Sequence, residues 1–155
     1  MRRYKIGTKY FEGVVDITDP GYDKDVWCRM TAEVKAGEYT CCVWRHTEKM
    51  EYNGREYNDV RVGIIGIYLD GIIPNTKLMK QIGEIGVDAG LAGFFMNKPD
   101  YNDEEWDEFC DSMGKGDTWI KDEGFFSSSG YGDGYYPVYA YKINNEIVAL
   151  EIRFL

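Results

Sequence analysis

The strongest constraint on the fold is a period of two in the C-terminal part of the chain. From 146 to 154 the side chains are expected to point to two faces in turn, with Val148, Leu150, Ile152 and Phe154 on one and Ala149, Glu151 and Arg153 on the other. This alternation is typical of a β-strand that buries one face. The Asn144-Asn145 pair separates it from a second strand-like run, 135–143, so the sequence predicts an antiparallel hairpin.

The rest of the chain is also rich in strand signals. Strands are predicted at 10–17, 38–44, 60–69, 84–88 and 91–96, where β-branched and aromatic residues are concentrated. Between them lie the turn signals Asp19-Pro20-Gly21-Tyr22, Lys35-Ala36-Gly37, Asn53-Gly54 and Ala89-Gly90. The segment 74–81 is expected to form a short helix capped by Asn75 or Thr76.

One longer helix is predicted directly after Asn102. Asn102 as N-cap and Glu105 three residues later make a capping-box pattern. An apolar stripe follows at i, i+3, i+4 and i+7 on an otherwise acidic helix, formed by Trp106, Phe109, Cys110 and Met113. Gly114 is the expected end of the helix.

Strands outnumber helices, and no repeat, low-complexity run or linker divides the chain. We therefore expect a mainly β fold, an antiparallel sandwich or open barrel with one or two short helices; an α+β fold is the alternative. With 155 residues, 44% of them hydrophobic, the chain fits a single domain spanning 1–155. The acidic helix is interpreted as an insertion at about 97–123.

Negative charge is concentrated in one segment. The formal net charge is −9, from 18 basic and 27 acidic residues. Residues 100–123 contain ten of the acids and two of the bases, so this segment carries −8 and the rest of the chain −1. Such a field attracts a basic protein surface and repels nucleic acid. The predicted partner-binding residues are Glu104, Glu105, Asp107, Glu108 and Asp111; a solvated helix face that only keeps the protein soluble is the alternative.

Cysteine usage and hydropathy indicate a compartment. The four cysteines, Cys28, Cys41, Cys42 and Cys110, include no C-x-x-C pair, and adjacent Cys41 and Cys42 would point to opposite faces of a strand. Reduced, partly buried thiols are expected. No apolar stretch approaches the roughly 20 residues of a membrane-spanning helix, and no apolar signal segment follows the first residues. We expect a cytoplasmic protein that binds neither a membrane nor zinc.

A second candidate site is the Ser-, Gly- and Tyr-rich stretch 125–136. Its rings and hydroxyls are suited to stack on and hydrogen-bond a small planar ligand. It contains no Walker, G-x-G-x-x-G or G-x-S-x-G pattern, and His46 is the only histidine, so no catalytic serine and no cofactor are expected. The predicted ligand-binding residues are Ser128, Ser129, Tyr131, Asp133 and Tyr135, together with Asp88.

Three aspartates, Asp19, Asp88 and Asp133, lie beside or close to glycines. If the fold brought them together, their oxygens would suit metal-assisted hydrolysis. Aspartate is also a common turn residue that accepts hydrogen bonds from nearby N–H groups. No EF-hand spacing is present, and no metal ligand is assigned.

Several motifs occur in an order that resembles a known bacterial family. They are 14–20, 36–39, 59–63, 87–90 and, most specific, 129–139 with its Ser-Gly-Tyr-Gly-Asp-Gly block. The pattern is similar to the uncharacterised family known as domain of unknown function 4241. The resemblance spans most of the chain, implies a β-rich fold and supplies no activity. The segment 97–123 departs from the pattern, which suggests a partner surface particular to this chain.

Three functions follow from these features, in this order. The first is a non-enzymatic binding module, such as an inhibitor, an immunity protein or a counter-defence protein of a phage or mobile element, whose acidic helix binds a basic partner. The second is a small-ligand binder, for instance a sponge for a nucleotide-like signal. The third is a metal-assisted hydrolase. We expect a binding protein rather than an enzyme.

Overall fold

The chain folds around one antiparallel β-sheet, which confirms the predicted mainly β class. A computed structural model describes all residues 1–155. One α-helix, α1 (Asp103–Met113), and one 3₁₀ turn, η1 (Thr76–Leu78), accompany the strands. The nine strands are β1 (Arg2–Thr18), β2 (Met30–Tyr52), β3 (Arg55–Leu69), β4 (Lys80–Val87), β5 (Leu91–Phe95), β6 (Thr118–Ile120), β7 (Gly124–Ser128), β8 (Gly134–Ile143) and β9 (Glu146–Arg153).

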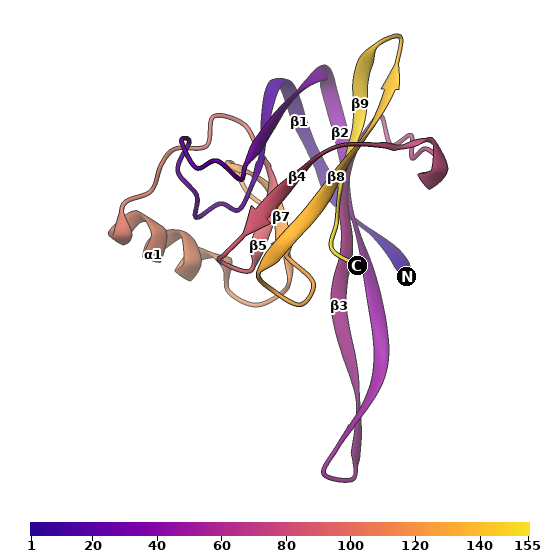
Figure 1. Cartoon of the computed structure of the whole chain (residues 1–155), viewed down its shortest axis with the longest axis vertical. Coiled ribbons are helices and arrows are strands. Elements are labelled where there is room, and N and C mark those ends of the chain that lie inside the picture. Colours follow the sequence, from indigo (N-terminus) through magenta and orange to yellow (C-terminus); the bar gives the residue numbers. More distant parts are fainter.

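The sheet is open. Its strand order is β4-β8-β9-β3-β2-β1-β5-β7-β6, so β4 and β6 form the two edges. Neighbours in this order pair antiparallel, and one additional parallel contact joins Val34 of β2 to Ile147 of β9. The sheet curls over itself, because the edge strand β4 also contacts β1 and β2 (Figure 1). The one α-helix has 11 residues, and no helix has the length and apolar character that crossing a bilayer requires.

The main hydrophobic core lies between the curled parts of the sheet. It contains 22 buried residues contributed by every strand except β6. In β9 the predicted alternation holds for Leu150 and Ile152, but the prediction for Val148 is wrong. The pairing of β8 with β9 skips Val148, so a bulge changes the phase and Ile147 occupies the core position instead.

The opposite side of the sheet carries a smaller core, formed by Cys42, Tyr68, Met79 and Ala149. Adjacent Cys41 belongs to the main core, as predicted for neighbours in a strand. All four cysteines are free thiols. Glu151 lies beside the smaller core and is only 1% exposed. Its carboxylate accepts hydrogen bonds from the Tyr68 hydroxyl at 2.5 Å and from Arg153 Nε at 3.0 Å, so this buried charge is paired.

Two local predictions are wrong. No turn forms at Lys35-Ala36-Gly37, because β2 continues through these residues as one strand of 23 residues. A bulge takes the place of the turn: Phe11 of β1 pairs with Gly37, and Gly13 pairs with Val34. The helix expected at 74–81 is reduced to η1, whose N-cap Asn75 accepts a hydrogen bond from the Lys77 N–H.

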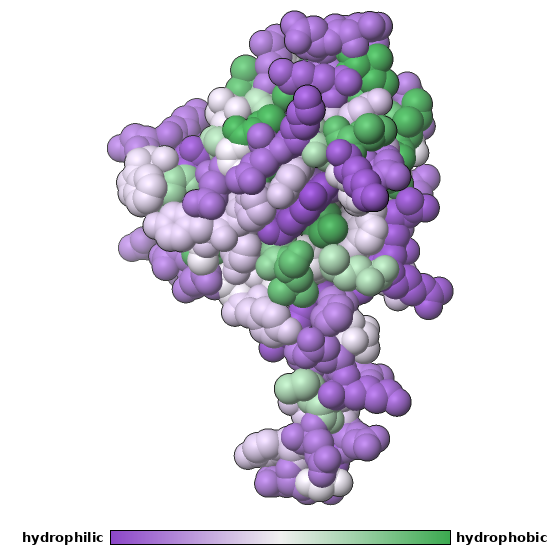
Figure 2. All heavy atoms as spheres, turned by 45° about the vertical axis from the view of Figure 1, so that its right-hand side comes forward, coloured by the Kyte–Doolittle hydropathy of each residue, from purple (hydrophilic) through white to green (hydrophobic).

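The outer halves of β2 and β3 form an arm that projects from the body (Figure 1). The predicted turn closes it, with Asn53 and Gly54 at φ values of 51° and 75°. Positive φ at both positions is what a two-residue type I′ hairpin requires. Residues 47–58 are all exposed, and Figure 2 shows the arm as a narrow, mostly hydrophilic projection below the body. The arm therefore adds little to the hydrophobic core.

Candidate functional site

Helix α1 carries exposed acids that have no basic partner in the molecule. The predicted capping box is present: the Asn102 side chain accepts from the Glu105 N–H at 2.8 Å, and the Glu105 carboxylate accepts from the Asn102 N–H at 3.1 Å. None of the five ion pairs involves α1. The exposed acids are the predicted partner-binding residues Glu104, Glu105, Asp107, Glu108 and Asp111. Only Glu105 is engaged by the protein, through the cap.

An aromatic cluster holds α1 against β5 and β7. The Phe109 ring lies 5.2 Å from the Phe126 ring, and the Trp106 ring stacks on Phe109 at 5.4 Å. At the other end of the helix, Trp119 Nε1 donates to the Met113 carbonyl at 2.9 Å. The predicted apolar stripe thus faces the sheet, and the acids are displayed on a rigid support.

A pocket of about 210 Å³ lies where the start of α1 meets the loop 19–29 and the turn 88–90. Three of its lining residues are carboxylates, three are aromatic and none is basic. The eight lining residues are Asp19, Gly21, Tyr22, Asp88, Ala89, Tyr101, Asp103 and Trp106. A Cβ at Gly21 would lie 3.3 Å from the Trp106 ring, so the glycine lets the helix approach the loop closely.

Asp19 is fully buried where these segments meet. Its Oδ1 accepts from the Gly21 N–H at 2.7 Å, and its Oδ2 accepts from the N–H groups of Asp88 at 2.8 Å and Ala89 at 2.6 Å. Burial raises the pKa of this carboxyl, and the three N–H groups oppose the rise. Asp19 thereby joins a loop and a turn that are about 70 residues apart in the chain.

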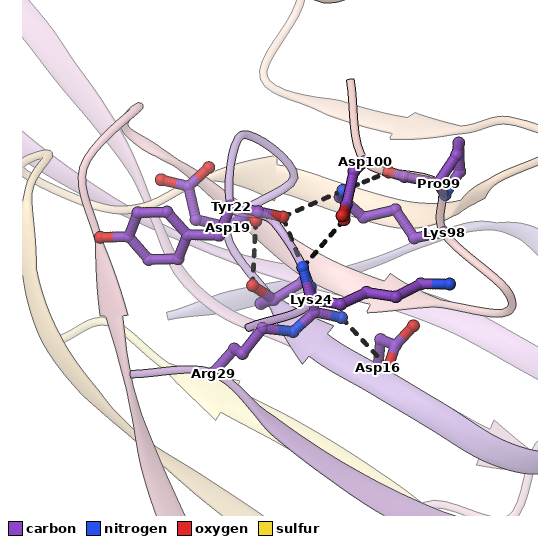
Figure 3. A network of polar contacts seen from close by, with 9 residues as sticks. Asp16, Asp19, Tyr22, Lys24, Arg29, Lys98, Pro99 and Asp100 are labelled. Atoms are coloured by element: carbon purple, nitrogen blue, oxygen red, sulfur yellow. Dashed lines mark hydrogen bonds and ion pairs between the residues drawn. The ribbon is translucent and has the colours of Figure 1, made fainter. Parts of the chain in front are cut away.

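A second polar network holds the loop 19–29 (Figure 3). Lys98 is 1% exposed, and its Nζ donates to the carbonyls of Tyr22 at 3.1 Å and Pro99 at 2.7 Å. Burial lowers the pKa of Lys98, and the positive charge of nearby Arg29 lowers it further. Arg29 pairs with Asp16 at 3.2 Å. Lys98 and Arg29 therefore both hold the loop in place through contacts within the protein.

The serines of the predicted ligand-binding stretch satisfy their own backbone. Ser129 is 1% exposed, and its hydroxyl donates to the Gly132 carbonyl at 2.7 Å. The Tyr136 hydroxyl donates to the same carbonyl at 2.6 Å. Ser128 is half-buried, and its N–H donates to the Asp117 carbonyl at 2.8 Å. None of the five main pockets is lined by residues 127–136.

The other predicted residues of this stretch are exposed. The Arg61 guanidinium lies 4.9 Å from the centre of the Tyr131 ring, and its Nε donates to Asp59 at 3.2 Å. Asp133 is exposed beside this turn. The only cation next to the Tyr131 ring is thus already paired with a carboxylate.

Tyr135 has an aromatic neighbour that the sequence reasoning missed. Trp27 is 81% exposed and Tyr135 is 58% exposed, and their ring centres are 6.2 Å apart. Trp27 lies on the loop 19–29, in which only 19–22 was predicted, as a turn. The sequence did offer one signal for an exposed Trp27. This tryptophan lies between two predicted strands, so the strand pattern does not assign it to the core.

The three aspartates beside glycines do not share one site. Asp19 and Asp88 line the pocket, whereas Asp133 does not. No group of three or more His, Cys, Asp or Glu side chains is arranged to hold a metal ion. Of the hydrogen bonds to Asp19, the one from the Gly21 N–H is the local contact of a turn aspartate, whereas those from Asp88 and Ala89 are long-range.

The four other main hollows are all larger than this pocket. One of about 410 Å³, between β2 and the β8–β9 hairpin, is lined by Glu33, Lys35, Lys142 and Glu146, whose charges cancel. One of about 510 Å³ lies along β4 and β8 and includes Leu78 and Ile82. A hollow of about 260 Å³ along α1 does combine carboxylates with aromatic rings: it is lined by Tyr101, Glu105, Glu108, Phe109, Ser112 and Glu123. The pocket at the start of α1 adds a third aromatic residue and the buried carboxylate of Asp19, and it is the candidate site.

The pocket was only partly visible in the sequence. Asp19 and Asp88 were considered together as aspartates close to glycines, and the acidic helix was considered separately; the structure brings both aspartates to the start of that helix. Tyr22 and Tyr101 were missed, and Trp106 was assigned only to the apolar stripe. The one local signal for Trp106 is its place in the first turn of α1, where a stripe residue also borders the loop before the helix.

Fold and site together define an open antiparallel β-sheet protein with an acidic helix and an acidic, aromatic pocket at the helix start. Comparison with protein-family models, with curated proteins and with solved structures finds no match. The resemblance to domain of unknown function 4241 stays a prediction.

Proposed function

We propose that this protein is a non-enzymatic binding module that acts in the cytoplasm on a basic protein partner, as an inhibitor, immunity or counter-defence protein does. The observation that carries the proposal is the row of exposed acids on α1 that have no cation partner. Free thiols support a reducing compartment.

Electrostatics explain how such a surface works. Several carboxylates close together on a rigid helix create a local negative field. This field accelerates the encounter with a basic surface and disfavours acidic partners. Because these side chains are exposed, dissolved salt screens them over a distance of about 10 Å at 0.1 M. Binding is therefore expected to weaken as the salt concentration rises.

A small planar ligand remains the second proposal. It is supported by the exposed ring pair Trp27 and Tyr135, which is suited to stacking. The internal hydrogen bonds of Ser129 reduce what the neighbouring serine stretch offers such a ligand. Native mass spectrometry of the purified protein tests it: a small adduct that is lost on denaturation supports this second function.

The test of the main proposal uses two variants with equal charge. The first replaces four helix acids by lysine: Glu104, Asp107, Glu108 and Asp111. The control replaces four exposed acids of β2 and β3 by lysine: Glu33, Glu38, Glu51 and Glu56. Each variant changes the net charge from −9 by +8 to −1, and Glu105 is kept because it completes the helix cap.

Tagged wild type and both variants are used to retain partners from the native host, and the retained proteins are quantified by mass spectrometry. We expect a protein with a basic surface to be retained by wild type and by the control, and lost from the helix variant. Equal retention by all three proteins, or equal loss from both variants, would contradict a role for α1.

A further inference from the structure

We infer that the pocket at the start of α1 receives one lysine or arginine side chain of the basic partner. The inference rests on the proposed function and adds to it the residue that is recognised and the place where it binds. It is carried by a cavity whose walls are aromatic and whose charges are all negative.

The aromatic walls suit the head of a cationic side chain. Tyr22, Tyr101 and Trp106 contribute rings from two different segments of the chain. Trp106 is kept in place by its stacking on Phe109. A guanidinium or ammonium group within about 6 Å of such a ring is attracted by its negative face.

Two of the three pocket carboxylates, Asp88 and Asp103, have no cation partner in the molecule, whereas Asp19 is held by three N–H groups. Asp88 and Asp103 are exposed at the pocket, and Asp19 is buried beneath them. No lysine or arginine lines the pocket. The buried cation Lys98 donates to two backbone carbonyls and lies 4.7 Å from the centre of the Tyr101 ring. Because Lys98 already lies against Tyr101, the groups left for a cation from outside are the rings of Tyr22 and Trp106 and the exposed carboxylates of Asp88 and Asp103.

The volume of the pocket favours a single side chain over a larger ligand. A volume of about 210 Å³ equals that of roughly seven waters at about 30 Å³ each. This is below the roughly 300 Å³ at which pockets for drug-sized ligands begin. The end of an arginine or lysine side chain is of suitable size, whereas a nucleotide is too large.

The pocket is formed before any partner binds. Asp19 joins the loop 19–29 to the turn 88–90 through three N–H groups, and Lys98 fixes the same loop at Tyr22. Because the walls need not reorganise, little conformational entropy is lost on binding.

The test uses a defined probe, N-acetyl-arginine methylamide, titrated into ¹⁵N-labelled full-length protein and followed by NMR. We expect saturable shifts of the Trp106 indole N–H and of the Asp88 and Ala89 amides. The indole N–H groups of Trp44 and Trp119 do not line the pocket and serve as internal controls. N-acetyl-leucine methylamide at the same concentration is the uncharged control probe.

Three variants separate the pocket from general attraction to the helix. Ala89→Leu fills the pocket without changing charge and is expected to weaken probe binding at least about tenfold. Asp103→Asn removes one lining charge and is expected to weaken it about three- to fivefold, as for a partly exposed ion pair. Asp107→Asn removes the same charge from α1 outside the pocket and is expected to leave probe binding unchanged.

Each outcome bears on the inference. Saturable shifts that disappear in Ala89→Leu support it. Absence of shifts, equal effects of Asp103→Asn and Asp107→Asn, or unaltered binding in a folded Ala89→Leu protein would overturn it. If the helix charge variant loses its partner while Ala89→Leu retains it, the proposed function stands and this inference fails.

Discussion

Arg45 and Asp117 illustrate, at the residue scale, how paired charges connect distant strands. Arg45 on β2 donates to both carboxylate oxygens of Asp117, just before β6, at 3.0 and 2.6 Å. Partial burial acts to raise the pKa of Asp117, but the hydrogen bonds from Arg45 and Thr118 outweigh it and hold this pKa below its usual value. The ionised form therefore stabilises the fold.

Replacing Asp117 by asparagine is expected to lower the free energy of unfolding by about 1 to 2 kcal/mol at pH 7. The folded pKa lies below the unfolded value of 3.8, so this stabilisation is present above pH 3.8 and is lost as pH falls through the folded pKa. Urea unfolding from pH 7 to pH 3 should show the gap from wild type closing. Asp59→Asn is the control, because the partner of Asp59, Arg61, is more exposed than Arg45. A gap that does not change with pH would contradict the assignment.

Asp19 is expected to be important for stability as well as for the pocket. An amide in its place cannot accept hydrogen bonds from all three N–H groups, so Asp19→Asn should lower the free energy of unfolding by about 2 kcal/mol. Asp88→Asn, whose side chain is exposed, should change it by less than about 0.5 kcal/mol. Urea unfolding monitored by tryptophan fluorescence measures both, and equal effects would show that Asp19 is not the link.

At the scale of elements, three local signals form the predicted structure and two do not. The Asn53-Gly54 and Asn144-Asn145 turns and the capping box of α1 form as predicted. Each depends on residues within a few positions of one another. The prediction of a turn at Lys35-Ala36-Gly37 was wrong because pairing with β1 keeps β2 extended, and a bulge forms there in place of a turn.

The arm gives a prediction for a whole element. Residues 47–58 are exposed, and a two-stranded hairpin without further packing contributes little stability. Replacing 48–59 by a single Asn-Gly turn should therefore change the free energy of unfolding by less than about 1 kcal/mol. Chemical denaturation measures it, and a loss above about 3 kcal/mol would show that the arm supports the core.

At the scale of the whole molecule, the open sheet has edges that need protection. The β4 edge has a bulge at Ile82, exposed Lys80 and Glu84, and a hydrogen bond from the Gly86 N–H to the Cys28 carbonyl at 2.8 Å. Bulges, charges and covering loops are the features that prevent edge strands from pairing with other chains.

Removing the charges of this edge should promote self-association. The double variant Lys80→Ile and Glu84→Ile leaves Ile82 between two further apolar residues on an edge strand. We expect the weight-average molecular weight of this variant in sedimentation equilibrium to rise with protein concentration more steeply than that of wild type. The control is the double variant Lys142→Ile and Glu146→Ile on the β8–β9 hairpin. If both variants self-associate to the same extent, added surface hydrophobicity, and not exposure of the β4 edge, is the cause.

The sequence by itself determined the β-rich class, two hairpin turns, the boundaries of α1 and the concentration of acid on that helix. These features arise from period-two patterning, turn conformations and hydrogen bonds between near neighbours, which act within a short stretch of chain. A reader of the sequence can therefore place them without knowing the strand order.

Only the tertiary structure decided the candidate site and the burial of Glu151. Asp19 meets the turn 88–90 across about 70 residues, and Glu151 meets Tyr68 across 83. Such contacts depend on which strands are neighbours and on bulges that change the phase of a strand. Local residue preferences do not specify these, because the free energy that selects them comes from packing the whole sheet around one core.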